Sequence, residues 1–113
     1  MKINVKENKE IRILEVSGEI DFYSSRDLRQ KFQEVLDKKA SKLLVDLKKV
    51  SYIDSSGLAT FVEALQRMNQ AGGKLVLVGL TAAVRSVFEI AKLDSIFILA
   101  DSEERAASVL TES

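Results

Sequence analysis

The strongest constraint on the fold is a junction within residues 44–62, LVDLKKVSYIDSSGLATFV, where an apolar run gives way to helical spacing. The apolar residues around Val45 are typical of a strand that is buried on both faces. From Leu58 onward, apolar side chains recur every three or four residues, which predicts a helix. The polar segment between them is Asp54, Ser55, Ser56 and Gly57. This passage from a buried strand into a helix is the first place to look for function.

Two interpretations of residues 54–57, DSSG, stay open on the sequence alone. Asp, Ser and Gly at a helix start hold the first free backbone N–H groups, so the segment can simply be a helix cap. A polar helix start that is exposed can also carry a functional side chain. The physical chemistry of the residues does not separate Ser55 from Ser56.

The rest of the chain predicts an α/β fold in a single domain, residues 1–113. Strands near residues 3–5 and 11–16 form an antiparallel hairpin, whose turn is Glu7, Asn8 and Lys9. The later elements are a connection over 18–25 (GEIDFYSS), a helix, a strand over 43–47, a helix over about 55–71, a strand over 75–80, a helix after 81, a short strand over 96–99 and a last helix. The order ββαβαβαβα predicts a mixed, mostly parallel sheet of about five strands with about four helices.

Local capping patterns predict where the helices begin and end. Capping boxes pair a polar residue with an acidic one three positions later, and the candidates are Ser24 with Asp27, and Asp101 with Glu104. Thr81 is a further predicted N-cap. Gly72 and Gly73 are expected to supply left-handed positions after the helix that begins at Ser55.

The carboxyl ends of the strands indicate where a site would lie. In open sheets of this kind, sites form beyond those ends, where the loops holding Asp21 and Ser55 both emerge. If their strands are adjacent and parallel, these two residues are neighbours on one rim of the sheet. For Asp21, a role toward a partner or phosphate and a role as a cap of the next helix both stay open. Asp46 is interpreted as structural, and Leu58 as a core residue by its spacing.

The residue types that the chain lacks exclude several enzyme classes. It contains no His and no Cys, so a Ser-His-Asp triad, a Cys nucleophile and an ordinary zinc site are impossible. Chemistry with carboxylates alone, from Asp21, Asp46 and Asp54, stays formally open, although nothing in the sequence brings them to one pocket. We therefore expect a protein that is not an enzyme and that uses no cofactor or metal.

Charge and hydropathy narrow the range of partners. Seventeen basic residues balance seventeen acidic ones and aromatic residues make up 6% of the chain, so nucleic-acid binding is not expected. No apolar run approaches the roughly 20 residues that span a bilayer. The opening MKINVKENKE lacks the apolar stretch of a signal peptide. We expect a cytoplasmic protein that has no membrane contact and is a monomer when free.

Four segments carry a family resemblance: GEID at 18–21, LLVDLKKVSYIDSSGL at 43–58, GGKLVLVGL at 72–80 and VRSVFEIAKLDSIF at 84–97. With them the chain resembles the STAS domain of anti-sigma factor antagonists nearly from end to end. The resemblance implies partner switching, in which the unmodified antagonist binds an anti-sigma factor that is also a serine kinase, and so frees the sigma factor. Phosphorylation of one serine reverses the binding, and a metal-dependent serine phosphatase restores it.

The resemblance also implies roles for individual residues. It places the phosphorylated serine at Ser55, directly after Asp54. Partner-binding or phosphate-proximal roles are implied for Asp21, Asp54, Ser56, Gly57 and Leu58. At Gly57, a side chain would crowd an approaching kinase or partner backbone, although a glycine is also simply tolerated near a helix end. The chain departs from many relatives at Ala59 and Thr60, where they have Gly and an aliphatic residue, and this departure bears on the identity of the partner.

Two other functions remain as alternatives. The chain can be a constitutive STAS subunit of a larger assembly, such as a stressosome-type scaffold or a lipid-transport complex, in which the serines are only caps. Nucleotide binding near Asp21 is a third, weaker alternative. Co-purification from the native cell distinguishes the antagonist from the constitutive subunit, because the first would bring down a kinase and sigma pair and the second a large scaffold or a transporter.

Overall fold

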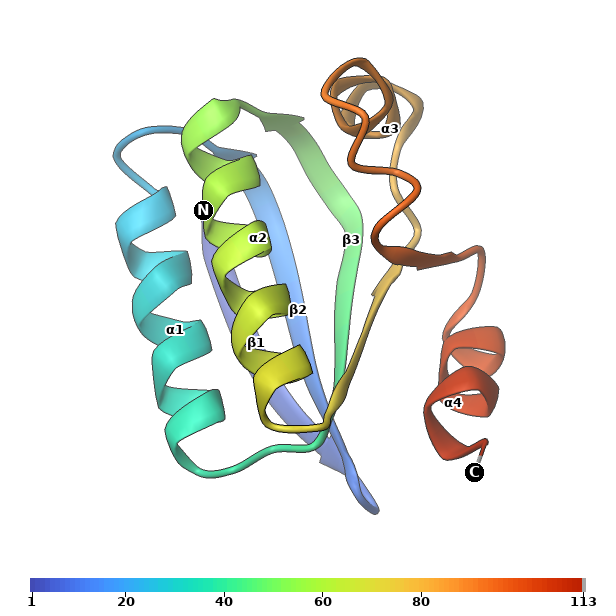
Figure 1. The fold of residues 1–113 in the computed structure, drawn as a ribbon. Coiled ribbons are helices and arrows are strands. Elements are labelled where there is room, and N and C mark those ends of the chain that lie inside the picture. The colour runs from blue at the N-terminus through green and yellow to red at the C-terminus, as the bar shows by residue number, and fades with distance from the viewer. Residues whose placement is uncertain (113) are drawn as a thin grey trace.

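The computed structural model describes residues 1–112 and shows a five-stranded sheet with four helices (Figure 1). The elements in chain order are β1 (Lys2–Asn8), β2 (Ile11–Ile20), α1 (Ser25–Asp37), β3 (Lys42–Ile53), α2 (Ser55–Gln70), β4 (Lys74–Val78), α3 (Ala82–Ile90), β5 (Ile98–Ala100) and α4 (Glu103–Thr111). The predicted order ββαβαβαβα is confirmed. Within the described residues, no helix is both long and apolar enough to cross a bilayer.

The strands lie in the order β1-β2-β3-β4-β5. β1 and β2 are antiparallel, whereas every later neighbour pair is parallel, so the predicted mixed sheet is confirmed. The hairpin turn is tighter than predicted, because Glu7 and Asn8 still pair with Arg12 and Ile11. The turn itself is at Lys9, whose φ of 58° is left-handed.

β2 and β3 extend further toward their carboxyl ends than the apolar pattern indicates. Residues 18–20, predicted as part of a connection, belong to β2, and β3 continues from residue 47 to Ile53. The pairing of these two strands shifts register between Glu15 and Ser17 and again between Gly18 and Glu19. Such irregularities break the two-residue alternation by which a strand is recognised, so the sequence pattern ends where the strand continues.

The two faces of the sheet are covered unequally. Helices α1, α2 and α3 pack on one face around Phe61, which is fully buried and meets the rings of Phe32, Phe88 and Phe97 at centroid distances of 5.5, 6.1 and 6.5 Å. α4 packs against the other face, with Ala106 and Leu110 in a smaller cluster. Figure 1 shows α1 and α2 side by side, with α4 set apart from them near the C-terminus.

The structure confirms only some of the predicted N-terminal helix caps. Thr81 caps α3 as predicted, because its Oγ1 accepts the Val84 N–H at 3.3 Å. The cap of α4 is Ser102 and not Asp101, since Ser102 Oγ accepts the Arg105 N–H at 3.1 Å. Ser24 stands at the N-cap of α1 but its side chain makes no capping hydrogen bond, so that predicted capping box is wrong.

The turn after α2 uses its two glycines differently. Gly72 has the predicted left-handed backbone, with φ of 75°. Gly73 does not, and a Cβ there would lie 2.9 Å from the Ser41 carbonyl oxygen and 2.8 Å from the Met68 methyl carbon. The second glycine therefore serves the close approach of two chain segments and not a left-handed turn.

Candidate functional site

The carboxyl ends of β2 and β3 form one rim of the sheet. Ile20 and Ile53 are paired in register at these ends, and the Asp54 N–H donates to the Ile20 carbonyl oxygen at 3.1 Å. The chain leaves β2 into the turn at Asp21 and leaves β3 into α2 at Ser55. The expectation that the loops holding Asp21 and Ser55 are neighbours is therefore confirmed.

Asp54 is the N-cap of α2. Its Oδ1 accepts the N–H groups of Ser56 at 3.0 Å and Gly57 at 3.3 Å, and the Ser56 hydroxyl at 2.5 Å. These bonds hold the pKa of Asp54 below its ordinary value, and the Ser56 hydroxyl contributes most. Partial burial and the negative charge of Asp21 act in the opposite direction. The helix start therefore carries a fixed carboxylate at neutral pH.

The two serines of the segment have different surroundings. The Ser56 side chain is partly buried and bonded to Asp54. Ser55 is exposed at the first residue of α2, and within residues 1–112 no group is hydrogen-bonded to its hydroxyl. The helix cap therefore occupies Ser56 and leaves Ser55 accessible to an enzyme or a partner.

Gly57 and Leu58 face inward from the first turn of α2. A Cβ on Gly57 would lie 2.7 Å from Ile20 Cγ2 and 2.7 Å from Ile53 Cγ1. The glycine thus lets the helix start approach the ends of β2 and β3, which differs from the sequence-based reason of access for a kinase. Leu58 is only 8% exposed and belongs to the main core, as its helical spacing indicates.

Thr60 lies one turn after Ser56 in α2. Its side chain is buried, and its Oγ1 donates to the Ser56 carbonyl oxygen at 3.0 Å, one turn back in the helix. A buried hydroxyl that finds a partner within its own helix avoids the cost of an unpaired polar group. The threonine is therefore compatible with a buried position in α2.

Asp21 fixes the turn between β2 and α1. Its Oδ1 accepts the N–H groups of Tyr23 at 3.0 Å and Ser24 at 2.9 Å. The Ser24 backbone bond is the largest cause of a lowered Asp21 pKa. The carboxylate therefore fixes the turn before α1 and bonds no N–H group within α1 itself, so neither a cap of the helix nor a role toward a partner is shown for Asp21.

Two exposed aromatic side chains lie in this turn, and sequence reasoning missed them. Phe22 is 65% exposed and Tyr23 is 81% exposed. Both belong to the GEIDFYSS segment, which was interpreted only as a connection. The available signal was the occurrence of two neighbouring aromatic residues in a polar stretch between a strand and a helix.

Asp46 does not join the other carboxylates. It is buried, and it accepts the Lys48 N–H at 2.9 Å and the Lys48 Nζ at 3.2 Å. Its oxygens lie within 4.8 Å of those of Glu15 and Glu103, beside α4 and not at the ends of β2 and β3. Asp46 therefore has the structural role that was predicted, and carboxylate chemistry shared with Asp21 and Asp54 gains no support.

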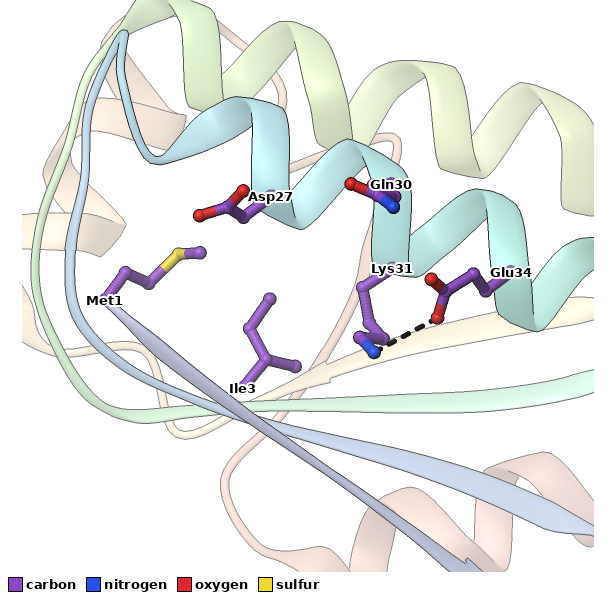
Figure 2. A pocket seen from close by; sticks show the side chains of 6 residues that line it. All are labelled: Met1, Ile3, Asp27, Gln30, Lys31 and Glu34. Carbon is purple, nitrogen blue, oxygen red and sulfur yellow. Dashed lines mark hydrogen bonds and ion pairs between the residues drawn. The ribbon is translucent and has the colours of Figure 1, made fainter.

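A shallow hollow lies between α1 and β1, away from the segment at Ser55. Its volume is about 300 Å³, and its lining residues are Met1, Ile3, Asp27, Gln30, Lys31 and Glu34 (Figure 2). Lys31 and Glu34 form an ion pair across one side, with an N–O distance of 3.0 Å. Neither Asp21 nor Ser55 lines it, so this hollow does not support nucleotide binding near Asp21.

The family model of the STAS domain matches residues 2–106 of the chain. The chain belongs to the STAS domain family. Among curated STAS relatives, the anti-sigma-B factor antagonist of Bacillus subtilis is 38% identical over 104 residues, which cover 91% of this chain and 94% of the relative.

Solved STAS structures share the fold. An anti-sigma factor antagonist from Mycobacterium paratuberculosis aligns with a TM-score of 0.91 at 23% identity, over 98% of this chain and 94% of that one. The Bacillus cell fate determinant SpoIIAA in its phosphorylated form aligns with a TM-score of 0.74 at 20% identity, over 96% and 99% of the two chains. At these identities the likeness concerns the STAS fold alone.

Proposed function

We propose that this STAS domain is an anti-sigma factor antagonist that is switched by phosphorylation of Ser55. The unphosphorylated form binds an anti-sigma factor that is also a serine kinase, and the sigma factor is thereby released. The observation that carries the proposal is the exposed, unoccupied hydroxyl of Ser55 beside a helix cap that is already complete. The 38% identity to an anti-sigma-B factor antagonist supplies the class of partner.

The helix start tolerates a phosphate on Ser55 without loss of the fold. The positive end of the α2 dipole favours negative charge at this position. Asp54 already occupies the N–H groups of Ser56 and Gly57, so the phosphate stays at the surface and does not replace the cap. The added charge of about −1.5 to −2 then acts mainly on whatever contacts the rim.

The electrostatic cost is sufficient for a switch. Two like unit charges 4 Å apart repel by about 1 kcal/mol in water and by about 4 kcal/mol at an effective dielectric constant of 20. A penalty of about 1 to 4 kcal/mol lowers affinity by roughly five- to a thousandfold. Desolvation of the phosphate in an interface adds to this penalty. No rearrangement of the core is needed.

The proposal has further parts that follow from the family. A metal-dependent serine phosphatase removes the phosphate and restores binding. The protein acts in the cytoplasm and catalyses no reaction itself. The free protein is a monomer.

The deciding experiment incubates the protein with its cognate kinase and ATP and locates the phosphate by mass spectrometry. We expect modification of Ser55, none in Ser55→Ala, and continued modification in the matched control Ser56→Ala. In pull-down assays, Ser55→Ala should retain the anti-sigma factor and Ser55→Asp should lose it. Phosphate found only at other residues contradicts the assignment, and recovery of a large scaffold in place of a kinase and sigma pair contradicts the partner class.

A further inference from the structure

The turn from β2 to α1 exposes two large aromatic side chains that pack on each other and not on the core. The rings of Phe22 and Tyr23 meet edge to face with centroids 5.5 Å apart. Among the described residues, neither belongs to the two buried clusters. Burial in the folded chain therefore does not explain why these two side chains are aromatic.

The backbone of this turn is fixed although its side chains are exposed. Asp21 Oδ1 holds the N–H groups of Tyr23 and Ser24. The Ser24 hydroxyl donates to the Glu19 carbonyl oxygen at 2.9 Å, which ties the turn back to the end of β2. A fixed backbone lowers the entropy that is lost when its side chains enter an interface. The pair is thus presented in a preorganised conformation.

The aromatic pair lies on the same rim as Ser55. The turn begins directly after Ile20, and the Asp54 N–H is bonded to the Ile20 carbonyl oxygen. Tyr52, two residues before Asp54, is also exposed, at 49%. A protein surface that reaches the Ser55 hydroxyl therefore approaches the same end of the sheet that carries the β2–α1 turn.

We propose that Phe22 and Tyr23 are the apolar anchor with which this rim docks on its protein partner, the anti-sigma factor with serine kinase activity. This inference rests on the proposed function, and it adds which side chains supply the affinity. The occupant is a protein because both side chains are largely exposed on the same rim as Ser55, and because exposed aromatic residues on a fixed backbone are typical of interface hot spots. Phe22 and Tyr23 supply the binding affinity, and phosphorylation of Ser55 switches the binding off.

The test compares wild type with the double variant Phe22→Ala/Tyr23→Ala in binding to the cognate anti-sigma factor by calorimetry. We expect a loss of affinity of about thirtyfold or more, which is the size of a hot-spot effect. The conservative variant Tyr23→Phe should bind as wild type does. Val5→Ala, which removes an exposed apolar side chain in the middle of β1, is the matched control and should also bind normally.

Kinase assays and a melting temperature distinguish a loss of docking from a loss of folding in the double variant. With the double variant as substrate we expect a raised KM for phosphorylation of Ser55 and an unchanged kcat, together with an unchanged melting temperature. If wild type binds and the double variant binds within threefold of it, the anchor is wrong while the proposed function stands. If wild type neither binds an anti-sigma factor nor is phosphorylated by it, both fail.

Discussion

The hydroxyl of Ser56 donates a 2.5 Å hydrogen bond to Asp54 Oδ1, and this bond assigns different tasks to two adjacent serines. Ser56 completes the cap of α2 together with Asp54. Ser55, one residue earlier, is left exposed. The same four residues thus hold a structural helix start and an accessible hydroxyl, so the two interpretations of the DSSG segment are compatible.

Replacing Ser56 by Ala should destabilise the protein without preventing modification of Ser55. The variant loses a hydrogen bond to a charged acceptor, which typically contributes about 1.5 to 3 kcal/mol, and partial exposure places the expected loss near the lower end. Urea denaturation measures the change. Ser55→Ala is the control and should stay within about 0.5 kcal/mol of wild type. Equal effects of the two substitutions would contradict the assigned cap.

Replacing Gly57 by Ala should destabilise the protein by about 1 to 3 kcal/mol, because the new methyl group overlaps Ile20 and Ile53. The cost comes from packing and not from the backbone, since Gly57 is not among the positive-φ residues. The double variant Gly57→Ala/Ile53→Val removes one methyl group from the contact and should recover part of the loss. Chemical denaturation of wild type and the two variants tests the prediction, and a neutral Gly57→Ala would contradict the close approach.

Truncation of a buried and of an exposed aromatic ring should change the free energy of unfolding by very different amounts. Phe61→Ala empties the centre of the core and should cost about 3 to 5 kcal/mol in unfolding free energy. Tyr23→Ala removes a ring that is 81% exposed and should change stability by about 0.5 kcal/mol or less. Thermal and urea unfolding provide the comparison. A large loss of stability in Tyr23→Ala would mean that the ring supports the fold.

Acid should destabilise the protein partly through Asp54. The folded-state pKa of this carboxyl lies below its ordinary value near 3.8, so the folded form binds the proton less readily than the unfolded form. Its contribution is therefore fully present above pH values near 4 and is lost as the pH falls through the lowered folded pKa. Unfolding free energies measured from pH 6 to pH 2 should fall less steeply in Asp54→Asn than in wild type. Equal slopes would contradict the charged cap.

The sequence predicts the fold well because most of its signals are local. The helical spacing after Leu58 and the apolar runs of β3 and β4 are periodic patterns that survive in the tertiary structure. The ends of β2 and β3 were missed because their paired residues include Gly18 and Tyr52 and because the register shifts interrupt the alternation. Strand pairing, which a single strand does not encode, decided those boundaries.

The candidate site was predictable in position but not in detail. The rim shared by Asp21 and Ser55 followed from parallel strands alone. The different roles of Ser55 and Ser56 did not follow, because serine commonly caps helices and both residues are serines. Only the hydrogen bond from the Ser56 hydroxyl to Asp54 distinguishes them. The exposure of Phe22 and Tyr23 was also missed, because an aromatic residue in a sequence more often indicates burial than exposure and the polar surroundings of the pair were the only contrary signal.

β3 pairs with β4 only as far as Asp46, whereas its pairing with β2 continues to Ile53. The last part of β2 and β3 is therefore a two-stranded extension beyond the full sheet, braced on one side where the Thr81 hydroxyl bonds the Val50 carbonyl oxygen at 3.3 Å. The segment that carries Ser55 therefore follows the narrowest part of the sheet, where only β2 still pairs with β3.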